Sequence, residues 1–187
     1  MAFGFRKTEI PDVVIITPKA FGDPRGFFME TYKRSEFREN GIDCDFVQFN
    51  HSKSNKNVLR GLHYQMYPYA QGKLVRALRG SFYAVAVDLR KGSPYYGRHV
   101  GAVLSEKNRD MIWVPKGFAF GNCALEDGTE LYYCVTDEYG PESQRGVAWD
   151  DPNLGIEWPT NKPLLSEKDS KNPRLKDAEI NFIYGQC

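Results

Sequence analysis

Residues 57–65 read Asn-Val-Leu-Arg-Gly-Leu-His-Tyr-Gln, a short segment with the alternating character of a β-strand. Because successive side chains of a strand point to opposite faces, we expect Arg60 and Leu62 to share one face. The other face then carries the remaining alternate residues, which are Leu59, Gly61, His63 and Gln65. A histidine on a rigid strand is either a hydrogen-bonded structural residue or a base held for chemistry, and this segment alone favours neither role.

Strand-like segments continue along most of the chain, separated by turn-forming residues. They are expected at residues 13–17, 27–32, 45–51, 58–65, 72–78, 81–89, 98–104, 111–114, 118–124 and 130–136. One short helix is expected at 35–40, with Ser35 as its N-cap and Gly41 just past its end. This pattern, with 17 glycines and 11 prolines, predicts a mostly β sandwich or barrel with a few short helices. We expect a single domain over residues 1–187.

The charge of the chain is nearly balanced, with 25 basic and 24 acidic residues. This balance argues against a nucleic-acid-binding domain that relies on bulk positive charge, but it leaves room for a small anion site. No apolar run reaches the length of a membrane span, and the N-terminus lacks the apolar core of a secretory signal. The four cysteines include no Cys-x-x-Cys pair and the three histidines no His-x-His pair. The sequence therefore predicts a cytoplasmic protein without a metal site.

Basic residues inside the strand-like segments are the first indication of a binding site. They include Arg60, Lys73 and Arg76. Lysine and arginine are rarely buried without partners, so these residues either face solvent or form a focused anion site.

Two further features could support acid–base chemistry. Tyr132 and Tyr133 are adjacent on one strand, so only one of them faces the interior, where its hydroxyl could donate a proton opposite a histidine base. Asp169 lies in the polar run 165–169, and a carboxylate behind a histidine holds the ring and favours its protonated form. The sequence pattern alone does not bring Asp169 to His63.

Short motifs follow one another in a recognisable order along the chain. They lie at residues 25–30, 46–52, 58–65, 71–76, 85–90, 93–94, 115–119, 155–159 and 165–169. Together they resemble the dTDP-4-dehydrorhamnose 3,5-epimerase family. The resemblance implies a cupin-type jelly-roll barrel and an isomerase that needs no metal or redox cofactor. It also implies a nucleotide-linked 4-keto-6-deoxyhexose as substrate, supplied for a surface polysaccharide or a glycosylated metabolite.

The resemblance implies roles for four residues in proton transfer at the carbons beside the keto group. His63 matches the base that removes a proton to give an enolate, and Asp169 matches the carboxylate that orients this base. Tyr133 matches the acid that returns a proton to the other face of the sugar. Lys73 matches the cation near the developing enolate oxygen, where a charge is worth roughly 3 kcal/mol.

The resemblance also implies contacts with the rest of the substrate. The positions that match substrate-contacting residues are Gln48, Asn50, Arg60, Phe120 and Lys168. Tyr139 matches the aromatic residue that stacks on the nucleotide base. Arg25 and Glu30 match nucleotide contacts that a partner subunit lends in the family's homodimer.

Four positions depart from the family pattern. Where the family usually has Asp, His, Lys and Glu, this chain has Phe49, Phe120, Cys134 and Gln144, respectively. Inversion of both C3 and C5 of a dTDP-4-keto-6-deoxyhexose is the leading hypothesis. Phe49 and Phe120 suggest the alternative of a single-carbon epimerase, or one acting on another nucleotide-linked 4-keto sugar. A 3,4-ketoisomerase and a sugar-nucleotide-binding module without activity are the remaining alternatives.

Overall fold

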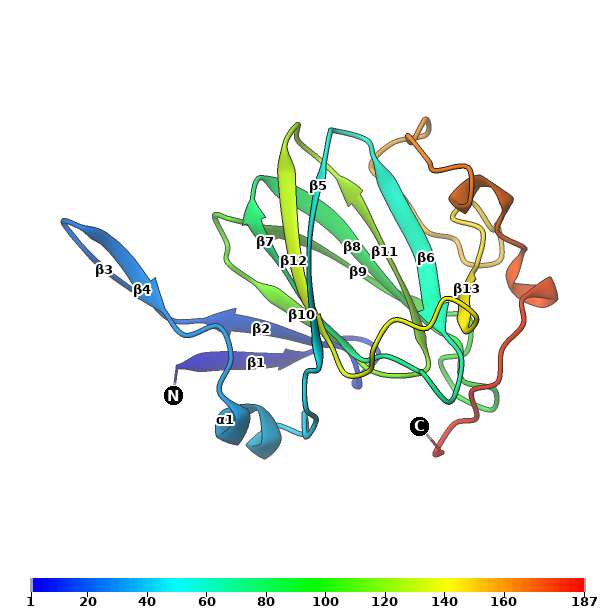
Figure 1. The fold of residues 1–187 in the computed structure, drawn as a ribbon, viewed down its shortest axis with the longest axis horizontal. Helices are drawn as coiled ribbons and strands as arrows, with labels where there is room; N and C mark the ends of the chain where they lie inside the picture. Colours follow the sequence, from blue (N-terminus) through cyan, green and yellow to red (C-terminus); the bar gives the residue numbers. More distant parts are fainter. Residues whose placement is uncertain (1, 187) are drawn as a thin grey trace.

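The computed structural model describes residues 2–186, which form two facing antiparallel sheets (Figure 1). The larger sheet has six strands in the order β1 (Phe3–Lys7), β2 (Val14–Pro18), β10 (Met111–Val114), β7 (Lys73–Arg79), β12 (Thr129–Val135) and β5 (Gln48–Ser54). The smaller sheet has five strands in the order β13 (Gln144–Gly146), β6 (Leu59–Gln65), β11 (Phe118–Ala124), β8 (Ser81–Asp88) and β9 (His99–Ser105). The predicted mostly β architecture is confirmed.

The main core lies between the two sheets, because alternate residues of the facing strands are apolar. Val75 and Ala77 of β7 share this buried cluster with Phe82 and Ala84 of β8. Full burial of a side chain such as Phe82 contributes about 1.5–3 kcal/mol. The remaining residues of the same strands point outward, so each sheet also has an outer face to be covered.

Helix α1 (Arg34–Glu39) packs on the outer side of the larger sheet, where Phe37 lies fully buried against Phe3. The prediction of Ser35 as N-cap is wrong. The cap is Lys33, whose extended backbone precedes the helix and whose side chain pairs with Glu36. Charge pairing across the first turn thus takes the place of a side-chain cap.

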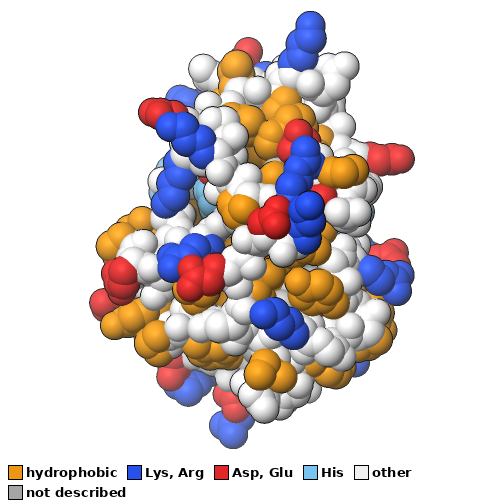
Figure 2. Space-filling view, turned by 90° about the vertical axis from the view of Figure 1, so that its right-hand side faces the viewer, with side chains coloured by type: hydrophobic (Ala, Val, Ile, Leu, Met, Phe, Trp, Pro, Cys, Tyr) orange, Lys and Arg blue, Asp and Glu red, His pale blue; other side chains and the backbone are white. Residues whose placement is uncertain are grey.

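The outer face of the smaller sheet is covered by the C-terminal part of the chain, on the right of Figure 1. Its two 3₁₀ turns are η1 (Asp169–Lys171) and η2 (Leu175–Asp177). Ile180 and Phe182 share a buried cluster with Leu62 of β6, which fastens this segment to the sheet. Figure 2 looks onto this side and shows acidic and basic side chains interspersed over it.

A hairpin of β3 (Ala20–Asp23) and β4 (Gly26–Met29) projects away from both sheets (Figure 1). Its side chains Phe27 and Phe28 are 57% and 68% exposed. The sequence pattern did not predict β1, β3 or β13. These strands have five, four and three residues and lie at sheet edges or in the hairpin, so they are too short to show a clear alternation.

Candidate active site

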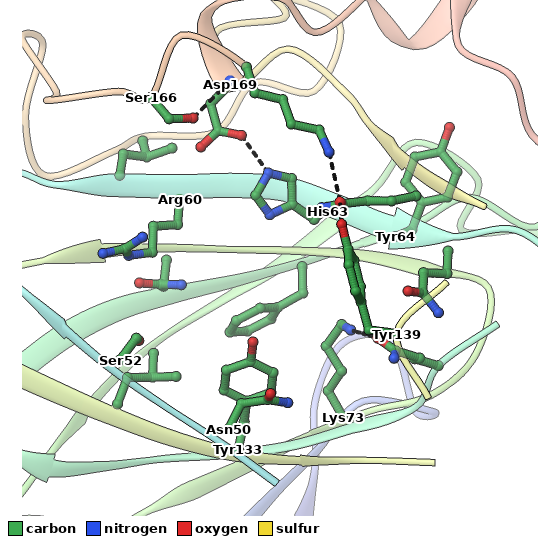
Figure 3. A pocket seen from close by; sticks show the side chains of 18 of the residues that line it. Asn50, Ser52, Arg60, His63, Tyr64, Lys73, Tyr133, Tyr139, Ser166 and Asp169 are labelled. Atoms are coloured by element: carbon green, nitrogen blue, oxygen red, sulfur yellow. Dashed lines mark hydrogen bonds and ion pairs between the residues drawn. The ribbon is translucent and has the colours of Figure 1, made fainter. Parts of the chain in front are cut away.

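A cavity of about 350 Å³ opens between the two sheets (Figure 3). Its wall brings together ten of the predicted site residues, namely Gln48, Asn50, Arg60, His63, Lys73, Phe120, Tyr133, Tyr139, Lys168 and Asp169. They come from strands of both sheets, from the loop after β12 and from the C-terminal segment. Polar groups that converge in a cleft of this size are typical of a small-molecule site.

The prediction that Arg60 and Leu62 share a face is wrong. Arg60 lines the cavity with His63, whereas Leu62 is buried on the outer side of the sheet. The alternation breaks at Gly61, where φ is +127° and the pairing with β11 shifts register. A Cβ at this position would lie 2.5 Å from the Cα of Gly121, so only glycine allows β6 and β11 to approach each other this closely. This close approach accompanies the inward orientation of both Arg60 and His63.

His63 and Asp169 form a hydrogen-bonded pair between His63 Nε2 and Asp169 Oδ1. The Asp169 side chain is only 5% exposed, and burial alone would favour its neutral form. Hydrogen bonds from His63, Ser166 and the Gly61 backbone outweigh burial and hold the pKa of Asp169 below its usual value. The ionised carboxylate accepts the proton of Nε2, which leaves Nδ1, on the cavity side in Figure 3, as the basic nitrogen.

Tyr133 enters the cavity from β12, in the sheet opposite His63 (Figure 3). Burial raises its pKa, although the positive charge of Arg60 acts in the other direction. The phenol is therefore protonated at neutral pH and can donate that proton. Tyr132 lines a separate hollow on the outer face of the larger sheet, which confirms that the two tyrosines point in opposite directions.

Lys73 is the most buried cation of the cavity, with 9% of its surface exposed. Its Nζ donates a hydrogen bond of 2.7 Å to Gln71 Oε1, and within residues 2–186 no ion pair joins it to a carboxylate. Burial lowers the pKa of Lys73 to about 8, so the ammonium form prevails at neutral pH. An unpaired charge in this position suits an oxyanion that forms during a reaction.

A chain of hydrogen bonds runs along the mouth of the cavity. Gln48 accepts the backbone N–H of Tyr139 at 2.9 Å and donates to Asn50 Oδ1 at 2.8 Å. Tyr139 Oη and Lys168 Nζ each donate to Gln144 Oε1, both at 2.7 Å. In the sequence, Gln144 stands out only as a departure from a family pattern, and no sequence signal marks Gln71 as the partner of Lys73.

Arg25 and Glu30 do not reach this cavity. Arg25 sits in the turn of the hairpin, with its side chain 89% exposed and paired with Asp23 at 2.5 Å. Glu30 follows directly after β4. The structure therefore does not bring these two residues to the cavity of their own chain.

Two departures from the family pattern lie outside the cavity. Phe49 and Cys134 are cross-strand partners on β5 and β12, and both line the hollow on the outer face. Because Gln48 and Asn50 point inward, Phe49 points outward and does not line the cavity of its own chain. Phe120, by contrast, lines the cavity and is paired with His63 across β6 and β11.

The described residues contain no group of three or more His, Cys, Asp and Glu side chains arranged to hold a metal ion. Over residues 2–186, no helix has the length and apolar character needed to cross a membrane.

The chain is similar to proteins of a known family. A family model described as dTDP-4-dehydrorhamnose 3,5-epimerase matches residues 7–177. The chain belongs to this family. This member is thus an epimerase, that is, an isomerase. It is 52% identical to the dTDP-4-dehydrorhamnose 3,5-epimerase of Shigella flexneri, over 92% of this chain and 96% of the relative.

Its fold matches solved structures of the epimerase family. A crystal structure of a dTDP-6-deoxy-D-glucose-3,5-epimerase from Legionella pneumophila, in complex with dTDP-4-keto-L-rhamnose, aligns with a TM-score of 0.90. That alignment covers 93% of each chain at 44% identity, and it confirms the cupin-type jelly roll. At 38% identity, over 97% of this chain and 90% of the relative, the chain also matches a dTDP-4-dehydrorhamnose 3-epimerase of Streptomyces niveus.

Proposed function

We propose that the protein inverts C3 and C5 of dTDP-4-keto-6-deoxyglucose to give dTDP-4-dehydrorhamnose. The observation that carries this proposal is the placement of a base and an acid on opposite sheets. His63 enters the cavity from β6 and Tyr133 from β12 (Figure 3). A sugar lying between the sheets loses a proton on one face and gains one on the other, and this exchange inverts the carbon.

Each inversion proceeds through an enolate. His63 Nδ1 takes the proton from the carbon beside the keto group, and the electron pair of the broken C–H bond moves onto the keto oxygen. The ammonium of Lys73 stabilises that oxyanion, a contribution of roughly 3 kcal/mol. Tyr133 Oη then gives its proton to the opposite face of the carbon as the keto group reforms. Asp169 keeps the base in the reactive tautomer throughout.

The nucleotide lies at the cavity mouth in this proposal. Arg60 and Lys168 meet the diphosphate, Gln48 and Asn50 contact the sugar, and Tyr139, which is 53% exposed, offers its ring to the base. The dTDP-sugar in the Legionella structure supports a dTDP-linked substrate.

The free thiols of Cys44, Cys123 and Cys134 support a cytoplasmic location, while Cys187 lies outside the described residues.

Solvent exchange tests the reaction. The protein is incubated with dTDP-4-keto-6-deoxyglucose in deuterium oxide, and the C3 and C5 protons are followed by NMR. Exchange at both carbons, abolished in His63→Ala, is the expected result. A His63→Ala variant that exchanges at the parent rate would overturn the mechanism.

The alternative is an epimerase that inverts one carbon only. It is favoured by Phe120, an apolar ring in the cavity that cannot hydrogen-bond to the sugar, and by the similarity to the Streptomyces niveus 3-epimerase. Exchange confined to one carbon in the same NMR experiment would establish it. Binding without exchange at either carbon would instead indicate a module without activity.

We further propose a homodimer in which the hairpin of one subunit completes the cavity of the other. The projecting β3–β4 hairpin, with Phe27 and Phe28 exposed, supports this arrangement, because large apolar side chains at such a tip suit burial against a partner. Arg25 would then reach the partner's nucleotide.

Complementation between two inactive variants tests the shared site. His63→Ala and Arg25→Ala chains are unfolded together and refolded as a mixture. Random pairing puts half of the chains into mixed dimers, each with one intact site, so about a quarter of the parent activity should return. No recovered activity, or a monomer by light scattering, would refute the shared site.

A further inference from the structure

An arginine of the body of the protein lies against the hairpin of β3 and β4, which otherwise projects away from both sheets (Figure 1). Arg109, in the loop between β9 and β10, has its guanidinium carbon 4.5 Å from the centre of the Phe27 ring. Phe27 lies close to Arg25 at the tip, and its cross-strand partner is Gly22, which has no side chain to cover the ring. A cation this close to an aromatic face is attracted to it.

The loop that carries Arg109 is braced by its own hydrogen bonds. Asn108 Oδ1 accepts the backbone N–H of Ser105, and Ser105 Oγ accepts that of Asn108, both at 3.0 Å. Asp110 Oδ1 accepts the hydroxyl of Thr17 at 2.6 Å, which ties the loop to β2. Arg109 has a φ of +58°, a left-handed conformation that a residue with a Cβ keeps only where its surroundings require it. These bonds therefore fix the backbone from which the Arg109 side chain leaves.

The guanidinium of Arg109 is not held by an acidic side chain. Within residues 2–186, no ion pair joins it to a carboxylate, and its Nε is buried without a hydrogen-bond partner. The neighbouring carboxylate of Asp110 is bonded to Thr17 instead. Because a buried N–H without a partner carries a cost, the favourable contact with the Phe27 ring accounts for the placement of this side chain.

The hairpin has one face against its own chain and one face open. Successive side chains of a strand point to opposite faces, so Phe28 lies on the face away from Phe27 and Arg109. Phe28 pairs across the hairpin with Phe21, and both rings are largely exposed. The contact with Arg109 therefore leaves this pair, and Arg25 in the turn, free to meet a second subunit. An isolated two-stranded hairpin is marginally stable at best, so its direction depends on such contacts.

We infer that Arg109 is a positioning residue for the hairpin, which by holding Phe27 sets the direction in which Arg25 reaches the cavity of the partner subunit. This inference rests on the proposed function, because it takes from it the homodimer with shared sites. Arg109 does not line the cavity of its own chain. Its loss should therefore weaken substrate binding in the cavity of the neighbouring subunit and leave the cavity of its own chain intact.

Two variants of Arg109 test the role of its charge. Arg109→Met keeps an unbranched side chain without the charge, whereas Arg109→Lys keeps a cation that can lie over the Phe27 ring. Because residue 109 is partly exposed in a loop, both variants are expected to fold, and the melting temperature measured by circular dichroism checks this.

Steady-state kinetics with dTDP-4-keto-6-deoxyglucose give the first readout. For Arg109→Met, we expect KM to rise about fivefold with kcat within about 1.5-fold of the parent, because the hairpin affects binding of the nucleotide and not proton transfer. Arg109→Lys should keep KM within about 1.5-fold. In a Phe27→Leu background, which lacks the ring, Arg109→Met should raise KM little further, since the two residues act through one contact.

Mixed dimers show in which subunit the change is felt. The reference is the refolded mixture of His63→Ala and Arg25→Ala chains, in which the one complete cavity belongs to the Arg25→Ala chain. Adding Arg109→Met to the His63→Ala chain alters the hairpin that this cavity receives, and its KM should rise about fivefold. Adding Arg109→Met to the Arg25→Ala chain leaves that hairpin unaltered, and KM should equal the reference. Each variant assayed alone gives the background to subtract.

Equal KM values in the two mixtures that carry Arg109→Met would overturn the inference, because a general effect on folding does not depend on which chain lends its hairpin. An Arg109→Lys variant with the KM of Arg109→Met would do the same, since the charge would then have no part in the effect. If the reference mixture recovers no activity, the shared site of the proposed function is itself wrong and the inference falls with it.

Discussion

The buried charge of Lys73 gives the enzyme a predictable response to pH. Burial lowers the pKa of Lys73 to about 8, so the ammonium is progressively lost as the pH rises through that value. At pH 9 only about a tenth of the molecules retain the charge, and kcat should fall about tenfold below its plateau. Deprotonation of Tyr133 does not explain a decline near pH 8, since burial raises the pKa of this tyrosine above its ordinary value near 10.

Replacing Lys73 by methionine should separate activity from stability. The variant lacks the cation at every pH, so kcat should fall by roughly 10²–10³ and the decline near pH 8 should disappear. The same change should stabilise the fold. A shift of the Lys73 pKa from 10.5 to about 8 corresponds to a cost of roughly 3 kcal/mol in folding free energy for the charged form. This cost is fully present below pH 8 and is relieved as the pH rises toward 10.5.

The assay is a set of initial rates between pH 6 and 10 for parent and variant, with denaturant melts at the same pH values. Because the folded state is favoured as Lys73 loses its proton, the melts should exclude unfolding as the cause of the alkaline decline. A decline near pH 8 that persists in Lys73→Met would refute the assignment. A variant less stable than the parent at pH 7 would refute the burial penalty.

Three further changes test the site and its support. Asp169→Asn should lower kcat by roughly 10²–10⁴ with little change in substrate affinity, because the amide no longer holds the base in its reactive tautomer; a parent-like kcat would contradict this role. Gly61→Ala should lower the free energy of unfolding, measured by chemical denaturation, by at least roughly 3 kcal/mol, because its Cβ would meet the backbone of Gly121. The control is Gly41→Ala, where φ is +85° and the space around the Cβ is open, and it should cost about 1 kcal/mol. Phe49→Leu should leave kcat and KM within about twofold of the parent, because Phe49 faces away from the cavity; a tenfold change in either constant would place it in the site.

Strands that are covered on both faces could be predicted from the sequence because they read as short, nearly continuous apolar runs between turn-forming residues. Residues 111–114 and 118–124 were expected as strands and are β10 and β11. The short edge strands β1 and β13 were missed because neither contains such an apolar run. A single domain over residues 1–187 stays a prediction.

The site was harder to predict from pattern alone. Simple alternation put Arg60 and His63 on opposite faces, because it could not anticipate the register shift that follows from the close approach at Gly61. The pairing of His63 with Asp169 came from family resemblance, since no local pattern connects residues so far apart in sequence. The outward orientation of Phe49, by contrast, could have been read from its position between Gln48 and Asn50.

The distance along the chain between His63 and Asp169 has a consequence for biosynthesis. The two residues are 106 positions apart, and Asp169 belongs to the segment that closes over the smaller sheet. All thirteen strands of the described residues precede that carboxylate in the chain, so they leave the ribosome before it does. Under the proposed mechanism, a chain terminated between β13 and Asp169 therefore contains every described strand but lacks the carboxylate that orients its base.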